Sequence, residues 1–322
     1  MRKRILALLA LTLFAALDCN AAPLQVGKET LTKDTVWSGE VEVTGDVYVP
    51  PGVTLTVAPG TIVKFNRIDA QSDRNLFGGK VPYYAQAELI VRGKLVARGT
   101  AEKMIVFTSA EKEPQPADWG ALNFLGSSGN VLDYCRVLYA YNGIHSHGAQ
   151  VEVQHSELAK NAVAISIRKE DEVQGVPWWG QESDLTVKGS SIHDNKGGIN
   201  FRASRVAITG NSIKDNKFFG LWAKEKSLGE VSGNEITGNY KGIYIYRSEG
   251  TRIHHNNIYK NSEYDMAIAD EQESDVAAAQ NWFGSTDRTE IAAHLYDKES
   301  DPTVARIVFE PFLKEPVQVS GR

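Results

Sequence analysis

The chain has 322 residues, a formal net charge of −5, and a composition of 42% hydrophobic and 23% charged residues. This is the composition of a folded globular protein and argues against disorder. The sequence has no long Lys-rich or Arg-rich run, so its charge gives no reason to expect a nucleic-acid partner.

The N-terminus has the pattern of a secretory signal peptide. Basic residues at 2–4 precede an apolar run at 5–17 that is too short to span a bilayer, and small residues follow. We therefore expect residues 1–21 to be removed and the chain to be exported, to the periplasm or the outside, with no transmembrane span. The alternative is lipoprotein processing at Cys19, which would leave a lipid anchor, but Asp18 stands where a small residue is expected.

Residues 36–109 alternate apolar and polar side chains between Pro-Gly and Arg-Gly turns, which is typical of short strands. The segment NRIDAQSDRNLFGGKVPYYAQ at 66–86 breaks this alternation and is predicted to be an insertion. It carries Tyr83 and Tyr84, and the sequence leaves open which face of the protein it covers.

Between residues 184 and 283 the chain repeats with a period of about 22, which is the signature of a solenoid. Four isoleucines are separated by 21, 23 and 22 residues, and four asparagines keep the same steps. These are Ile192, Ile213, Ile236 and Ile258, and Asn195, Asn216, Asn239 and Asn261. No helical apolar stripe occurs within a unit, so each period predicts one coil of parallel strands.

The isoleucines are the anchors of the repeat, and Leu158 and Val137 continue their register toward the N-terminus. A column of small polar residues stands two places before each anchor, and Asn281 ends it. Its members are Cys135, Ser156, Ser190, Asn211, Asn234, Asn256 and Asn281. Such side chains can form hydrogen bonds from coil to coil at the strand spacing of about 4.8 Å, so we interpret the column as structural. Cys135 is expected to be an inert thiol, and export would leave it without a partner for a disulfide.

Several segments resemble the bacterial secreted right-handed β-helix proteins that are related in fold to pectate lyases. They are GDVYVPPGVTLTVAPGTIVKF, IVFTS followed by ADWGALNF, LDYCRVLYAYNGI, NWFG and the closing IVFEPFL. The resemblance implies the fold but no reaction, because that family contains lyases, hydrolases, epimerases and adhesins. The motifs of polygalacturonases and of the main pectate lyase family are absent from the chain.

We therefore predict an all-β protein in which residues 22–322 form one domain, a single-stranded right-handed parallel β-helix. A C-terminal cap at 285–322 is expected to contain a short helix near 288–297 and the strand RIVFEPF, because the open edge of the last coil needs a cover.

The repeat also predicts one exposed sheet face that carries aromatic rings and cations. An inward column of Ile144, Ile165, Ile199, Leu221 and Ile243 leaves its neighbours pointing to solvent. Those neighbours are His145, Ser166, Asn200, Trp222 and Tyr244, and, two residues further on, His147, Arg168, Arg202, Lys224 and Tyr246. The alternative is that the tyrosines only stack between coils and that the cations pair with carboxylates such as Glu225.

A second insertion, KEDEVQGVPWWGQES at 169–183, leaves the helix at the edge of that face. Trp178 and Trp179 near its tip have no place in the repeat, and long loops are often functional. The two tryptophans are therefore expected either to contact a ligand or to fold back over the sheet.

Three functions fit these features. The first is non-catalytic binding of a polysaccharide, since sugar rings stack on Trp and Tyr while Arg and Lys pair with acidic groups. The second is a polysaccharide lyase that would use His147, Arg168, Arg202 and Lys224 for β-elimination, with Ca²⁺ as an optional cofactor. The third is a scaffold that binds an envelope protein through the same face.

No metal site is expected from the sequence. His254 and His255 are adjacent, and on a strand they would point to opposite faces. Asp194 and Asp215 are one coil apart and are interpreted as turn residues. The first hypothesis therefore needs no cofactor.

Overall fold

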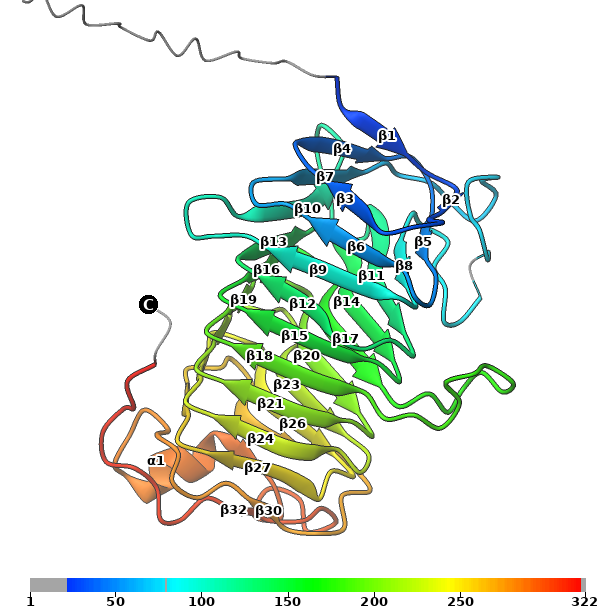
Figure 1. The fold of residues 1–322 in the computed structure, drawn as a ribbon. Helices are drawn as coiled ribbons and strands as arrows, with labels where there is room; N and C mark the ends of the chain where they lie inside the picture. Colours follow the sequence, from blue (N-terminus) through cyan, green and yellow to red (C-terminus); the bar gives the residue numbers. More distant parts are fainter. Residues whose placement is uncertain (1–21, 79, 320–322) are drawn as a thin grey trace, which may run out of the picture.

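The computed structural model describes residues 22–78 and 80–319, and it shows a right-handed parallel β-helix with three long sheets (Figure 1). The predicted signal peptide lies outside the described residues. Successive strands of the chain pass from one sheet to the next, so every sheet collects every third strand. The fold prediction is confirmed.

Sheet A has ten parallel strands. They are β1 (Leu24–Val26), β4 (Glu40–Val43), β7 (Ile62–Phe65), β10 (Ile105–Ser109), β13 (Cys135–Leu138), β16 (Glu157–Ala159), β19 (Ser191–His193), β22 (Ser212–Lys214), β25 (Glu235–Thr237) and β28 (Asn257–Tyr259). The anchors of the repeat lie here and are fully buried, because each points into the helix.

Sheet B has eleven strands. They are β2 (Glu29–Thr30), β5 (Val47–Val49), β8 (Leu89–Val91), β11 (Trp119–Leu125), β14 (Ala140–His147), β17 (Val163–Arg168), β20 (Gly197–Arg202), β23 (Phe219–Lys224), β26 (Lys241–Tyr246), β29 (Tyr264–Ile268) and β31 (Leu295–Tyr296). The predicted inward column from Ile144 to Ile243 is in register on this sheet and buried.

Sheet C has nine strands and faces the viewer in Figure 1. They are β3 (Thr35–Trp37), β6 (Thr54–Val57), β9 (Lys94–Arg98), β12 (Asn130–Asp133), β15 (Gln150–Gln154), β18 (Asp184–Lys188), β21 (Arg205–Thr209), β24 (Leu228–Ser232) and β27 (Gly250–His254).

The turn between sheets C and A contains the predicted ladder of small polar side chains. The backbone N–H of Asn211 donates to Oδ1 of Asn234 at 2.9 Å, and that of Asn234 donates to Asn256 at 3.0 Å. A second ladder runs through the repeat asparagines from Asn161 to Asn261. Cys135 begins the first ladder as a buried free thiol, and its burial raises its pKa, as an inert thiol requires.

The C-terminal end of the β-helix is covered by a helix and two short strands. Helix α1 (Arg288–Ala293) begins after Asp287, whose carboxylate accepts the backbone N–H of Thr289 at 2.7 Å. Strand β31 continues sheet B, and β30 (Val276–Ala277) pairs with β32 (Ile307–Val308). Apolar residues from this region, among them Ile291 and Phe309, join the main core, so the last coil does not expose its interior.

Both predicted insertions are loops that leave the same side of the β-helix (Figure 1). The insertion at 66–86 follows β7 and precedes β8, and the insertion at 169–183 connects β17 to β18. Each folds over the N-terminal half of the outer face of sheet B, and this decides which predicted site residues reach solvent.

Candidate functional site

The open part of sheet B carries six of the predicted ligand-binding or catalytic residues, and we call it the aromatic-basic face. It consists of Asn200, Arg202, Trp222, Lys224, Tyr244 and Tyr246, all partly exposed. The strands pair so that Asn200, Trp222 and Tyr244 form one row across three coils, and Arg202, Lys224 and Tyr246 form the next. The register predicted from the repeat is therefore confirmed.

Trp222 and Tyr244 lie on neighbouring coils with ring centroids 5.4 Å apart. The ammonium of Lys224 lies 3.4 Å from the centroid of the Trp222 ring, which is close contact for a cation and an aromatic face. Burial, followed by the positive charges of Arg168 and Arg202, lowers the pKa of Lys224 to about 8. The face thus presents two aromatic rings and an ammonium group that loses its proton more readily than an ordinary lysine does.

Two polar atoms on this face lack a partner among the described residues. They are Nε1 of Trp222, a donor, and Oδ1 of Asn200, an acceptor, and both are shielded from solvent. The two residues are paired in register on adjacent strands. Buried polar groups in folded proteins are normally hydrogen-bonded, so an unpartnered donor and an unpartnered acceptor on adjacent strands distinguish this part of the face.

The two arginines near this face are neutralised by carboxylates. For them, the alternative that the cations pair with carboxylates such as Glu225 is confirmed. Arg202 donates to Asp171 at 3.0 and 3.1 Å and to Glu225 at 2.9 Å. Arg168 pairs with Glu172 of the same insertion. Lys224, in contrast, forms no ion pair with any described carboxylate, so it is the cation that remains available to an anionic ligand.

The expectation that His145 is exposed is wrong. The insertion at 66–86 covers it, with Tyr84 against its ring at 5.1 Å between centroids. Nδ1 of His145 lies 3.0 Å from Oδ1 of Asn123, and Asn123 donates to Glu88 at 2.7 Å. Burial lowers the pKa of His145 and raises that of Glu88, so these groups form a buried polar network under the loop.

His147 is also buried, so the expectation that it is exposed is wrong, and Trp178 is buried as the fold-back alternative predicted. Oε2 of Glu170 lies 3.1 Å from Nδ1 of His147 and accepts the indole N–H of Trp178 at 3.1 Å. The Trp178 ring packs on Ile90 and Leu125, so it folds back over the sheet. A lyase that used His147 as its base would need this loop to open.

Trp179 is placed differently from its neighbour. Its side chain is exposed, with 44% of its surface accessible to solvent. Trp178 closes the loop and Trp179 points out of it, so the two predicted tryptophans do not form one surface.

A depression that the sequence did not reveal continues the aromatic-basic face toward the C-terminus. It has a volume of about 340 Å³ and is lined by Lys241, Tyr244, Glu263, Tyr264, Asp270 and Tyr296, among others. The ring centroids of Tyr264 and Tyr296 lie 5.2 Å apart, although 32 positions separate the two residues in the chain. Tyr296 comes from the cap rather than from the repeat, which is why the register could not place it here.

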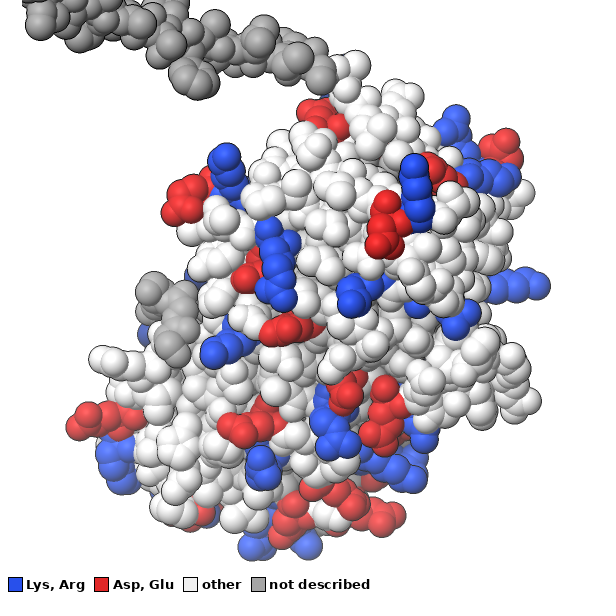
Figure 2. Space-filling view, in the orientation of Figure 1, with Lys and Arg blue, Asp and Glu red and all other residues white. Residues whose placement is uncertain are grey.

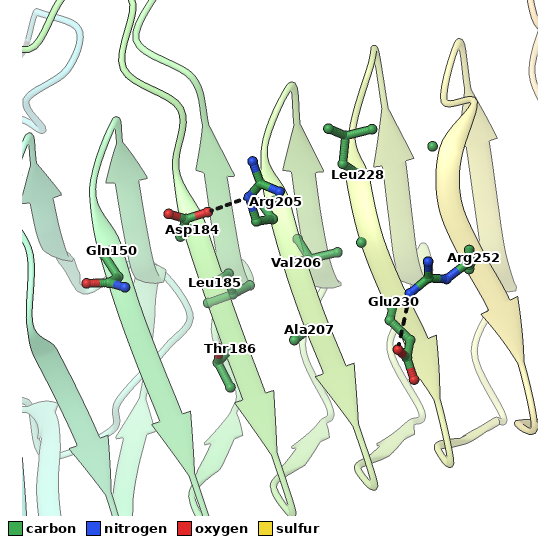
Figure 3. Close-up of a pocket in the computed structure, with 12 residues that line it drawn as sticks. Gln150, Asp184, Leu185, Thr186, Arg205, Val206, Ala207, Leu228, Glu230 and Arg252 are labelled. Carbon is green, nitrogen blue, oxygen red and sulfur yellow. Dashed lines mark ion pairs between the residues drawn. The ribbon is translucent and has the colours of Figure 1, made fainter.

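The outer face of sheet C holds another depression, of about 630 Å³, across β15 to β27 (Figure 3). Its floor includes the small side chains of Thr186 and Ala207, and ion pairs lie at its rim, such as Arg252 with Glu230 at 3.5 Å. On this side of the molecule acidic and basic side chains are interspersed (Figure 2). No single sign of charge marks it as an anion or cation surface.

The prediction that His254 and His255 point to opposite faces is wrong. Their Nδ1 atoms lie only 3.0 Å apart. Strand β27 ends at His254, and His255 has a left-handed backbone with φ of 54°, which turns its ring to the same side. Within residues 22–78 and 80–319, no three His, Cys, Asp or Glu side chains come together as a metal-binding group.

Fold and surface together define a β-helix protein of the pectate-lyase-like class with a candidate ligand-binding face on one sheet. Residues 29–135 match the pectate-lyase-like β-helix domain family. Residues 118–304 match the family described as periplasmic copper-binding protein (NosD). This match spans more than half of the chain, so the chain belongs to that family.

Solved structures of one enzyme share the fold. A variant of the periplasmic alginate epimerase AlgG aligns with 87% of this chain and 71% of its own, at 12% identity and a TM-score of 0.53. Another AlgG structure covers 92% of this chain and 74% of its own, at 14% identity and a TM-score of 0.46. At these identities only the fold is shared. No curated protein sequence matches the chain significantly, and in its described part no helix is long and apolar enough to cross a membrane.

Proposed function

We propose that this protein is an exported, non-catalytic β-helix that binds an acidic polysaccharide through its aromatic-basic face. The observation that carries the proposal is the arrangement of Trp222, Lys224 and Tyr244. The ammonium of Lys224 lies over the Trp222 ring without a carboxylate partner among the described residues, and the Tyr244 ring lies beside Trp222 on the next coil. Aromatic faces stack on sugar rings, and a cation beside them favours a uronate or sulfate group.

Two further features support a bound glycan. Sugar hydroxyls both donate and accept hydrogen bonds, which suits the unpartnered Nε1 of Trp222 and Oδ1 of Asn200. The depression that begins at Tyr244 extends the surface by another coil, so an extended chain could lie across the coils from Asn200 to Tyr296.

The N-terminal segment is proposed to direct export of the protein. The signal-peptide pattern of residues 1–21 supports export, and so does the periplasmic location in the family's description. N-terminal sequencing of the protein from a periplasmic fraction should begin at residue 22. A mature chain that begins with a lipid-modified Cys19 would instead establish the lipoprotein alternative.

Binding is tested by calorimetry with alginate, pectate and a neutral dextran. Trp222→Ala and Tyr244→Ala should each weaken binding of the acidic polymers by about 3- to 10-fold, as expected for the loss of one stacking contact. Lys224→Met should weaken binding of the acidic polymers only. Tyr134→Asn is the matched control, since Tyr134 stacks on His155 in a turn far from this face along the chain.

Equal binding by the wild type and all three face variants would contradict the proposal. Two alternatives would then remain to be tested. An unsaturated uronide product, detected by its ultraviolet absorbance, would reveal a lyase, and its base would have to become accessible from beneath Trp178. Capture of a defined envelope protein that depends on Trp222 would favour a scaffold.

The name of the family also contains copper, and the aromatic-basic face does not fit that metal. Its side chains are indole, phenol, amide, ammonium and guanidinium groups, whereas copper prefers imidazole and sulfur ligands. The ligand proposed for this face is therefore a polysaccharide and not copper.

A further inference from the structure

A depression of about 350 Å³ lies at the turns from sheet B to sheet C in three successive N-terminal coils. Its lining comes from residues 51–54 between β5 and β6, from 92–94 between β8 and β9, and from 126–128 between β11 and β12. The residues of the aromatic-basic face belong to later coils. Both charged residues that line the depression, Arg92 and Lys94, are cations, so we call it the basic depression.

The guanidinium of Arg92 is held by an aromatic ring rather than by a carboxylate. Its central carbon lies 4.1 Å from the centroid of the Trp178 ring. Arg92 forms no hydrogen bond or ion pair with any described residue, and its Nε is an unpartnered donor. Stacking fixes the plane of a guanidinium without using its N–H groups. Because the side chain is partly exposed, the terminal N–H groups of Arg92 are left for an oxyanion.

The insertion at 169–183 supplies the ring behind Arg92. Trp178 is only 3% exposed, and its indole N–H donates to Glu170 at 3.1 Å. A Cβ atom on Gly126 would lie 2.4 Å from Cβ of Trp178, so the tryptophan can approach this turn only because residue 126 is a glycine. The folded-back loop therefore places a fixed aromatic surface against the basic depression.

Three further side chains bring hydrogen-bond donors to the same depression. Lys94 is exposed, and its ammonium pairs with no described carboxylate. Ser127 is buried, and its hydroxyl oxygen accepts the amide of Asn130 at 3.0 Å, which leaves the hydroxyl hydrogen without a described acceptor. Ser128 adds an exposed hydroxyl. Donors from two neighbouring coils thus line one depression.

This set of donors fits a phosphate group. A guanidinium can bind two phosphate oxygens at once, an ammonium adds a compact charge, and hydroxyls can donate to a remaining oxygen. Two cations also match the charge of a phosphomonoester, which is about −1.5 to −2 at neutral pH. The carboxylate of Asp34 accepts the backbone N–H of Thr54 at 2.8 Å, and Asp34 is not among the lining residues.

We propose that the basic depression binds a phosphate group through Arg92, Lys94 and Ser127. Its volume lies within the range of about 300 to 1,000 Å³ for small-molecule sites, so a small phosphorylated molecule such as a sugar phosphate is the expected source of the group. Free inorganic phosphate is the other source with the same chemistry. This site goes beyond the polysaccharide binding proposed for the aromatic-basic face and does not depend on it.

The test is isothermal titration calorimetry of the purified protein with glucose 6-phosphate and with inorganic phosphate. One site per chain is expected, with tighter binding of glucose 6-phosphate. Equal affinity for the two compounds would also support the site and would identify free phosphate as the source. Arg92→Met and Lys94→Met should each weaken binding about tenfold or more, because each removes a charge-assisted hydrogen bond, and Ser127→Ala should cause a smaller loss.

Arg98→Met is the matched control, since Arg98 ends the strand that Lys94 begins and its side chain is 58% exposed beside Asp133. It removes the same charge and should bind glucose 6-phosphate as the wild type does, as should Trp222→Ala. Unfolding midpoints should show that every variant is folded. No binding of either compound by the wild type, undiminished binding by Arg92→Met and Lys94→Met, or an equal loss in Arg98→Met would overturn the proposal.

Discussion

The ammonium of Lys224 lies over the ring of Trp222, 3.4 Å from its centroid, and no described carboxylate forms an ion pair with it. On the neighbouring coil, Arg202 occupies the equivalent position and is held by two carboxylates. The two cations of one row therefore differ in their availability to a ligand, and this difference can be measured.

Binding of an acidic polysaccharide should weaken as the pH rises through about 8. Burial and the nearby arginines lower the pKa of Lys224 to about 8, so the side chain is charged below that pH and becomes neutral above it. The dissociation constant, measured by calorimetry on either side of this pH, should increase several-fold. Lys224→Arg should remove the dependence, because arginine stays charged throughout, and an unchanged profile in that variant would contradict the assignment.

Glu170→Gln should release the insertion at 169–183 without unfolding the β-helix. The carboxylate of Glu170 accepts the backbone N–H of Val173 at 2.9 Å as well as the bonds from Trp178 and His147. Loss of the charged acceptor should destabilise the loop by about 2 kcal/mol. Faster hydrogen exchange at Val173 and faster proteolysis within the loop would show it, while Glu172→Gln, on an exposed ion pair, should have little effect.

The same loop should open in acid. Although burial raises the pKa of Glu170, the backbone N–H groups of Val173 and Glu172 and the nearby His147 outweigh it and lower the pKa below 4.5. A lowered carboxyl pKa stabilises the loop above that range, and the stabilisation is lost as the pH falls through the folded-state value. Tryptophan fluorescence should therefore change below about pH 4.5 in the wild type and not in Glu170→Gln.

His145 should make the protein less stable in mild acid. Burial lowers its pKa below 6.5, so below pH 6.5 the unfolded chain takes up a proton that the folded chain does not, and the free energy of unfolding decreases. Asn stands at the equivalent position on the preceding coil, Asn123, and two coils further on, Asn200. The difference in free energy of unfolding between the wild type and His145→Asn, measured in urea, should be smaller at pH 5.5 than at pH 7.5 by up to about 1.4 kcal/mol. An equal difference at both pH values would contradict this.

Asn234→Ala should destabilise the β-helix more than Asn234→Ser. Oδ1 of Asn234 accepts two hydrogen bonds from Asn211, and its amide donates to Ile208 and Asn256. Alanine leaves these buried groups unpaired, which should lower the free energy of unfolding by about 2 to 4 kcal/mol. Serine fills the same column at position 190 and should halve the loss, and equal effects of both substitutions would argue against a ladder role.

The repeat in the sequence was enough to predict which residues share a row on sheet B. Strict spacing of Ile199, Leu221 and Ile243 fixes the register, because a slip by one residue would turn every buried side chain toward solvent. The aromatic-basic face follows directly from that register. The same reasoning could not predict that His145 and His147 are covered, since the loops that bury them lie outside the repeat.

The sequence by itself therefore determined the fold, the coil length, the asparagine ladders and the rows of outward side chains, because all of these repeat locally along the chain. Only the tertiary structure decided which rows stay open, how Trp178 and Trp179 differ, and that His254 and His255 meet. These features depend on where irregular loops fold back and on one left-handed residue at the end of a strand, and neither is encoded in a periodic pattern.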